Sequence, residues 1–334
     1  MTLPFWKFAR SRLAKGDPVF LAHVAHNTRH SPGTRGAQLA VTTGGATFGT
    51  IGGGIMEAQV LEIAQKAFQT GDFSPRYEQL VHRRKAPKGE NSRTSGLICA
   101  GTQTNVYHLL EADRDLAALT TIIDTLEADA PGLITIDAGG LSVDLATPDP
   151  AASPYHFEGG QTWRFSRQLL NWKRVAIIGG GHCGLALSRV MSQLGYAVTI
   201  FENRPDVFTF LENQFATRKV VVDDYQEAAA HIVHPRWTHV VVMTANQPDD
   251  LRALLGITEH SFPYIGVMGA PAKLTKIRRE LVEADVSREA VDAFYAPIGL
   301  PMTSNTPEEI AISIAGEILR ERQKLFPFAR PPAN

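Results

Sequence analysis

In the second half of the chain, short apolar runs alternate with stretches that have a helical spacing of apolar residues. The runs lie at residues 174–178, 197–201, 220–222, 239–243 and 264–267. Each is typical of a buried parallel strand. After the first run, apolar residues recur at the i, i+3, i+4 and i+7 positions of an amphipathic helix, at Leu187, Val190, Met191 and Leu194. This alternation predicts a parallel sheet with helices on both faces.

The last predicted helix has a clear start signature. Thr306 is a candidate N-cap, Pro307 suits the first turn, and Glu309 completes a capping box. Apolar residues then follow along one face, at Ile310, Ile314 and Ile318. We therefore expect this helix to pack on the sheet and to close a C-terminal domain over residues 171–326, with a polar tail at 327–334.

The first half of the chain has shorter apolar runs and scattered helical stretches. Strands are predicted at residues 19–24, 37–41, 46–48 and near 106–109, and a helix is predicted at 56–68. The second and third of these strands flank a Thr-Thr-Gly-Gly turn and predict a hairpin. We expect an α+β domain over residues 1–147, joined by a Pro-, Ala-, Ser- and Gly-rich linker at 148–170 to a Rossmann-like, doubly wound parallel sheet.

Composition and charge exclude several classes of function. The chain has 334 residues, 44% of them hydrophobic, which is enough material for two cores. Its 33 basic and 34 acidic residues leave a net charge of -1, so we expect neither nucleic acid nor a membrane surface as a partner. No signal peptide and no run of about 20 apolar residues is present, which predicts a cytoplasmic protein.

The second half carries a candidate phosphate-binding loop. Gly179, Gly181 and Gly184 form a G-x-G-x-x-G pattern between a predicted strand and a predicted helix, which allows a phosphate to approach the helix start closely. Glu202 ends the next strand, where an acid commonly bonds a ribose hydroxyl, and His182 lies inside the loop. These residues predict a site for NAD(P) or another nucleotide. The alternative is a Rossmann domain that serves only as a scaffold, with His182 in local packing.

The first half contains a second glycine-rich segment before a predicted helix. Its three consecutive glycines, Gly52, Gly53 and Gly54, offer backbone N–H groups that can close on an anion. Glu57 follows in the first helical turn. It is a candidate catalytic residue, and the alternative is that it caps the loop.

Two further polar residues of this half are candidates for chemistry. Arg35 lies in the loop Ser31–Gly36, where its guanidinium suits a phosphate or carboxylate, unless the loop is a solvated turn. Cys99 follows a basic loop that would lower the pKa of its thiol and make it a nucleophile or metal ligand; the alternative is a small core residue. Strand alternation places His23 and His26 on opposite faces, which argues against a shared zinc ion.

Several segments together resemble the XdhC/CoxI family. In order they are Ser31–Ala37, Gly49–Glu57, Gly96–Gly101, Ile178–Gly184, Tyr264–Gly269, Pro297–Leu300 and Thr306–Ala311. The resemblance runs over about residues 7–322. The chain departs from the family pattern in two places. It has Ile55 or Met56 where members often have Cys, and Ala100 where they often have Gly.

The resemblance implies a role in maturing molybdenum hydroxylases. Members bind the molybdenum cofactor (molybdopterin), assist the exchange of an oxo for a sulfido ligand with a cysteine desulfurase, and deliver the cofactor to the hydroxylase apoenzyme. Arg35 and the glycine segments would then bind the cofactor, with Cys99 as a ligand to molybdenum. The chain would be a maturation chaperone rather than a turnover enzyme. A homodimer is left open.

Two other functions compete with this interpretation. One is an NAD(P)-dependent oxidoreductase with an unusual N-terminal domain, and the other is a dinucleotide-sensing Rossmann protein. The oxidoreductase requires an acid–base pair near the glycine loop, where the sequence offers only His182. Both alternatives predict nucleotide binding without retention of molybdopterin.

Overall fold

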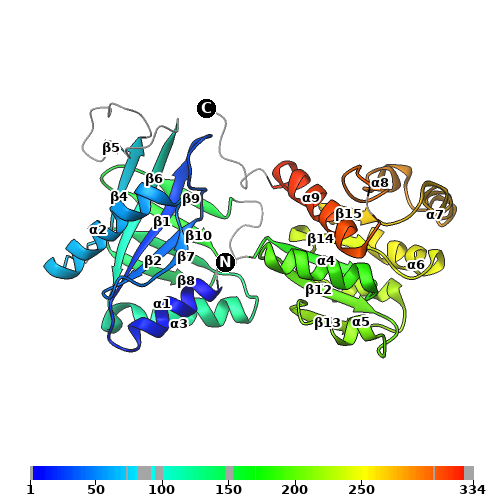
Figure 1. The fold of residues 1–334 in the computed structure, drawn as a ribbon, viewed down its shortest axis with the longest axis horizontal. Helices are drawn as coiled ribbons and strands as arrows, with labels where there is room; N and C mark the ends of the chain where they lie inside the picture. Colours follow the sequence, from blue (N-terminus) through cyan, green and yellow to red (C-terminus); the bar gives the residue numbers. More distant parts are fainter. Residues whose placement is uncertain are drawn as a thin grey trace. The chain divides into compact units, whose positions relative to one another are not determined.

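The chain divides into two compact units, each with its own sheets and core. The computed structural model describes residues 3–72, 74–81, 92–94, 101–146, 153–169, 171–303 and 305–326. The first unit is Met1–Leu170 and the second is Asn171–Pro327. Antiparallel sheets dominate the first and a parallel sheet forms the second, which confirms the predicted fold class (Figure 1).

A six-stranded sheet with the order β3-β2-β1-β6-β4-β5 is the framework of the first unit. Its strands are β1 (Val19–Asn27), β2 (Gln38–Thr42), β3 (Thr47–Thr50), β4 (Arg76–Val81), β5 (Ser92–Thr94) and β6 (Thr102–Leu110). All neighbours pair antiparallel except β4 and β5. The pairing of β2 with β3 confirms the predicted hairpin.

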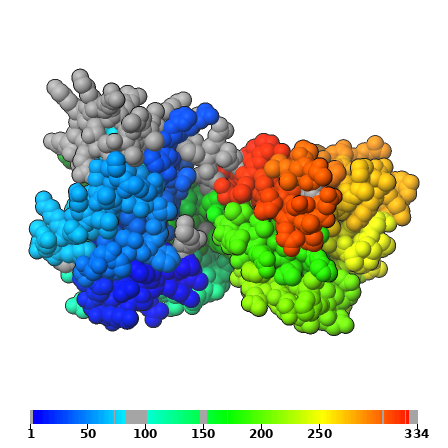
Figure 2. Space-filling model, in the orientation of Figure 1, coloured from blue at the N-terminus to red at the C-terminus, as the bar shows by residue number. Residues whose placement is uncertain are grey.

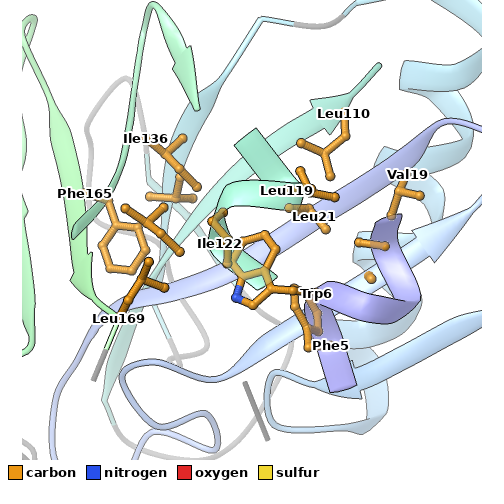
Figure 3. Packing of buried hydrophobic residues seen from close by; sticks show 14 of the residues in the cluster. Phe5, Trp6, Val19, Leu21, Leu110, Leu119, Ile122, Ile136, Phe165 and Leu169 are labelled. Atoms are coloured by element: carbon orange, nitrogen blue, oxygen red, sulfur yellow. The ribbon is translucent and has the colours of Figure 1, made fainter. Parts of the chain in front are cut away.

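Both faces of this sheet are covered. Helix α2 (Gly54–Thr70) packs Val60 and Ala64 onto one face. Against the other face lie α1 (Leu3–Leu13), α3 (Ala112–Glu127) and a second sheet. Figure 3 shows Trp6 of α1 and Ile122 of α3 among the buried side chains of this core. Because consecutive strand residues point to opposite faces, β1 contributes to both cores.

The second sheet of this unit has the order β8-β7-β10-β9. Its antiparallel strands are β7 (Leu133–Asp137), β8 (Gly140–Asp144), β9 (Tyr155–Glu158) and β10 (Arg164–Gln168). Two of them lie inside the stretch 148–170, so the linker prediction does not hold for residues 155–168. The physical reason is that Tyr155 and Phe165 bury their rings in the core of the first unit.

Strand β1 contains a β-bulge near its end. Val24 pairs with Asn105 but His26 pairs with Thr104, so Ala25 is one extra residue on β1. A bulge of this kind reverses the in–out alternation of the residues that follow it.

The bulge changes the direction of the His26 side chain. His23 pairs with Val106 and His26 with Thr104, and these two partners point to the same face of the regular strand β6. The prediction that His23 and His26 point to opposite faces was therefore wrong. Within the described ranges, no group of three His, Cys, Asp or Glu side chains is arranged to hold a metal ion.

The second unit is built on a five-stranded parallel sheet with the order β13-β12-β11-β14-β15. The strands are β11 (Arg174–Ile178), β12 (Ala197–Glu202), β13 (Arg218–Val221), β14 (Thr238–Val242) and β15 (Tyr264–Val267). Each predicted strand of this half is confirmed. The order reverses between β11 and β14, which is where doubly wound sheets bind ligands beyond the carboxyl ends of the strands.

Helices cover both faces of the parallel sheet. They are α4 (His182–Gln193), α5 (Phe208–Leu211), α6 (Gln247–Thr258), α7 (Pro271–Glu283), α8 (Arg288–Asp292) and α9 (Pro307–Leu325), with 3-10 turns η1 (Tyr225–His231) and η2 (Pro235–Trp237). Helices α4 and α9 share one core, and α6 and α7 share the other. Figure 2 shows the surfaces of α4 and α9 side by side.

The predicted start of α9 is confirmed in detail. The Glu309 N–H donates to Thr306 Oγ1 at 3.2 Å, and the Thr306 N–H donates to Glu309 Oε2 at 3.1 Å. Ile314 and Ile318 are buried against α4. Within the described part of the chain, no helix is both long and apolar enough to cross a bilayer.

Candidate functional site

Glu57 closes the glycine-rich segment of the first unit, residues 49–54, which we call the glycine loop. Its Oε1 accepts hydrogen bonds from Thr50 Oγ1 at 2.6 Å, the Ile51 N–H at 3.2 Å and the Gly53 N–H at 3.0 Å. The carboxylate therefore occupies backbone donors that could otherwise face an anion. This geometry favours the capping alternative for Glu57, while Gly54 begins α2.

A second loop, residues 28–36, packs directly on the glycine loop; we call it the arginine loop. A Cβ atom on Gly33 would lie 2.2 Å from the carbonyl oxygen of Ile51, and one on Gly52 would lie 2.7 Å from the Gly33 nitrogen. Neither position has room for a side chain. The structure thus brings together two segments that the sequence singled out separately.

Gln103 of β6 ties the two loops to the sheet. Its Oε1 accepts from the Gly33 N–H at 3.0 Å, and its Nε2 donates to the Ile51 carbonyl at 3.1 Å. Gln103 is fully buried. Sequence reasoning missed it, because Gln103 lies among polar residues ahead of the apolar run that predicted this strand. Cys99 lies outside the described residues, which resume at Gly101, and its role stays a prediction.

Arg35 lies in the arginine loop. Its guanidinium has no ion-pair or hydrogen-bond partner among the described residues. Its backbone N–H donates to Asn27 Oδ1 at 2.8 Å. Its Nε is buried and has no hydrogen-bond acceptor among the described residues. Burial lowers the pKa of Arg35, and burial together with the nearby Arg35 charge lowers the pKa of His26. A guanidinium in this state is suited to bind an anion.

In the second unit, the G-x-G-x-x-G segment forms the turn from β11 into α4, which we call the Rossmann loop (residues 179–184). A Cβ atom on Gly179 would lie 2.4 Å from the Met243 carbonyl oxygen, and one on Gly184 would lie 2.2 Å from the Gly179 carbonyl oxygen. These two glycines therefore allow the backbone of the turn and of the α4 start to pack closely against neighbouring backbone. Gly181 faces open space and His182 is exposed, so the backbone at the start of α4 is accessible.

Glu202 is buried and its carboxylate is engaged within the protein. It accepts from the Gly180 N–H at 2.8 Å, Arg204 Nε at 2.9 Å and the Tyr225 hydroxyl at 2.9 Å. Burial raises the pKa of Glu202, but the hydrogen bonds from Arg204, Gly180 and Tyr225 outweigh it and the pKa is lowered. This arrangement favours a structural role in which Glu202 holds the Rossmann loop. Sequence reasoning missed Tyr225, for which no motif gave a signal.

Cys183, the second residue of α4, packs against the apolar core between α4 and the sheet. Burial and the neighbouring Glu308 raise the pKa of its thiol. The thiol is therefore a weak nucleophile at neutral pH, in agreement with a packing role.

The predicted site residues form two groups, one in each unit. The first lies where the glycine loop and the arginine loop meet: Arg35, Gly52, Gly53, Gly54 and Glu57. The second lies at the Rossmann loop: Gly179, Gly181, His182, Gly184 and Glu202. Two surface depressions of the first unit, beside Gly16 and beside Gly139, are lined by none of these residues.

Comparison with known proteins identifies relatives of both units. The family model described as "XdhC and CoxI family" matches residues 12–78, and that described as "XdhC Rossmann domain" matches residues 175–318. The chain is 23% identical over 308 residues to "Uncharacterized protein YqeB" of Escherichia coli (strain K12), covering 91% of this chain and 43% of that protein. It is also 23% identical over 171 residues to a probable subunit of xanthine dehydrogenase from Bacillus subtilis (strain 168), covering 51% of this chain and 49% of that protein.

The chain therefore spans less than half the length of these curated relatives. One solved structure is similar over nearly its full length, the crystal structure of a xanthine dehydrogenase from Bacillus halodurans. The TM-score is 0.72 at 20% identity, and the match covers 96% of both chains. At this level of identity the likeness shows a shared fold.

Proposed function

The chain belongs to the XdhC/CoxI family, and from this premise we propose that it is an accessory protein of a xanthine dehydrogenase-type hydroxylase. In this proposal it binds the molybdenum cofactor, assists its sulfuration with a cysteine desulfurase, and passes it to the hydroxylase apoenzyme. The cofactor is cargo that the protein receives and releases, so the protein needs to hold and shelter it.

The observation that carries the proposal is the junction of the two loops beside Arg35. Molybdopterin ends in a phosphate group, and Arg35 has a half-buried guanidinium with no acceptor among the described residues. The two groups fit each other, because a guanidinium binds phosphate oxygens through paired N–H groups. When bound, the cofactor would supply the molybdenum on which an oxo ligand is exchanged for sulfido.

The remaining residues of the loops have supporting roles in this proposal. Glu57 would keep the glycine loop in one conformation through its three hydrogen bonds. Cys99 would act as a ligand to the cargo or as an acceptor of sulfur from the desulfurase. Replacing Cys99 with Ser would then lower hydroxylase activation while leaving the phosphate contacts of the cofactor in place.

Dinucleotide binding by the second unit is the competing candidate. The accessible backbone at Gly181 and His182 supports it, because free N–H groups at a helix start bind phosphate. The state of Glu202 weakens it, because a ribose hydroxyl would have to compete with the donors that this carboxylate already accepts.

An anaerobic titration with the molybdenum cofactor tests the proposal. We expect stoichiometric retention of molybdenum after gel filtration, and at least about tenfold weaker retention by Arg35→Gln, because a charge-assisted hydrogen bond is lost. Arg10→Gln is the matched control, since Arg10 is an exposed arginine of α1 in the same unit. No retention by the unmodified protein, together with saturable binding of NAD(P), would overturn the accessory role in favour of a nucleotide-binding one.

A further inference from the structure

A second arginine of the first unit is buried, and it too has no carboxylate partner among the described residues. Arg167 of β10 is only 8% exposed. Its Nη1 donates a long hydrogen bond, 3.4 Å, to the Gly36 carbonyl, and its Cζ lies 5.3 Å from the centre of the Tyr155 ring. Among the described residues, no Asp or Glu oxygen lies within ion-pair distance of it.

Arg35 and Arg167 both lie near Tyr155, although they are far apart in sequence. Gly36, which follows Arg35, lies so close to Tyr155 that a Cβ atom on it would be 2.4 Å from the phenol oxygen. The Arg167 guanidinium lies over the Tyr155 ring and donates to the Gly36 carbonyl. Tyr155 is also close enough to Arg35 to influence the pKa of its guanidinium.

The acids on the neighbouring strands are engaged elsewhere. Glu158 of β9 pairs with His156 at 3.0 Å, and Asp137 of β7 lies 3.8 Å from Arg164. Among the described residues, no acid therefore balances the two positive charges around Tyr155. Burying a charge without a partner costs free energy, and an arginine cannot escape this cost by losing its proton.

We propose that Arg35, Arg167 and the Tyr155 hydroxyl form a binding site for a phosphate-class dianion, either free or as the monoester end of a larger ligand. The combined charge of +2 on the two arginines matches the charge of a phosphate dianion. One carboxylate would neutralise only one of the two guanidinium groups. Two planar donor groups and a hydroxyl also suit the several acceptor oxygens of a tetrahedral oxyanion. Only the identification of the larger ligand with the molybdenum cofactor rests on the proposed function.

Isothermal titration of the full chain with inorganic phosphate at low ionic strength tests the site. We expect saturable binding of one phosphate, about tenfold weaker in Arg35→Gln and in Arg167→Gln, because each removes a charge-assisted contact. Tyr155→Phe should weaken binding less. Arg164→Gln is the matched control on the same strand, since Arg164 is exposed, and it should bind like the unmodified chain.

Arg167→Lys covers the case in which Arg167→Gln does not fold. Lysine keeps the positive charge but lacks the planar set of N–H donors of a guanidinium. We therefore expect a folded protein with phosphate binding weakened several-fold. Absence of saturable binding to the unmodified chain, or equal binding by the Arg164 and Arg167 variants, would overturn the site.

The larger ligand is tested separately by cofactor retention. Phosphate binding that depends on Arg167, without retention of the cofactor, would overturn the proposed function and leave the phosphate site standing. Cofactor retention that is unchanged in Arg167→Gln, with no phosphate binding, would overturn the site alone.

Discussion

One buried and one half-buried charged residue in this protein represent opposite electrostatic situations. Glu202 accepts hydrogen bonds from a backbone N–H, a guanidinium and a phenol, so its charge is balanced inside the protein. Arg35 has no such acceptor among the described residues. Because an uncompensated buried charge costs free energy, the first residue is typical of a structural role and the second of a binding role.

The structural role of Glu202 predicts a stability effect. Glu202→Gln should lower the free energy of unfolding of the second unit by about 3 kcal/mol, because an amide has one oxygen and cannot accept both the Gly180 N–H bond and the Tyr225 hydroxyl bond at this buried position. Equilibrium urea unfolding measures this change. If Glu202 served mainly to bind a ribose, the variant would instead lose nucleotide affinity and keep its stability. Glu212→Gln, at an exposed position, is the control.

Two buried histidines predict a loss of stability at mildly acidic pH. Burial lowers the pKa of His23 to about 3 and that of His239 to about 4. Below pH 6.5 the unfolded chain takes up protons that the folded chain does not bind. Stability is therefore complete above 6.5 and decreases as pH falls, by about 2 kcal/mol per histidine at pH 5.

Urea unfolding at pH 7 and pH 5 measures this effect, and His23→Phe supplies the comparison. The ring of His23 lies among Phe5, Trp6 and Phe165, so phenylalanine fits the surroundings without titrating. The first unit of this variant should lose about 2 kcal/mol less between the two pH values than that of the unmodified chain. An identical pH dependence in the two proteins would rule out His23 as a cause.

At the scale of elements, the contact between the two loops of the first unit depends on small residues. Gly33→Ala should lower the free energy of unfolding by about 1–3 kcal/mol, because the new methyl group would overlap the Ile51 carbonyl oxygen. Gly44→Ala in the β2–β3 turn is the matched control, since a Cβ atom there meets nothing within 4 Å. Urea unfolding of both variants tests the packing, and equal stabilities would contradict it.

The elements that the sequence predicted best are those with strong local signals. The parallel strands of the second unit are continuous apolar runs, and α9 has a complete capping box, so both were recognised from the sequence. The second sheet of the first unit was not. Its strands β9 and β10 are short and follow a Pro- and Ala-rich stretch. They form because β10 pairs with β7 and because their apolar side chains pack into the core.

The same distinction applies to the candidate site. Glycine motifs identify the glycine loop, the arginine loop and the Rossmann loop from sequence alone. Their partners cannot be found in this way, because Gln103 and Arg167 acquire their contacts through strand pairing between distant segments. The bulge in β1 likewise has no local signature, and it reversed the direction assigned to His26.

For the whole molecule, the division into two units predicts independent folding of the second. All five parallel strands and both of their cores lie within residues 171–326. A fragment of these residues should unfold cooperatively in urea and keep a dispersed NMR spectrum, because its apolar faces are covered by its own helices. A molten or aggregated fragment would show that the second unit needs the first.

The extra residue in β1 bears on which changes of chain length the protein tolerates. After Ala25, Asn27 pairs with Gln103 and binds the backbone of Arg35. Deleting this one alanine would leave His26 opposite Thr104 and Asn27 opposite Gln103 in a regular ladder, so Asn27 would keep its face. Deleting any other single residue between Val19 and Asn27 would instead turn part of the strand toward the opposite face. Natural sequences related to this chain that are one residue shorter in this strand should therefore lack the residue at the bulge.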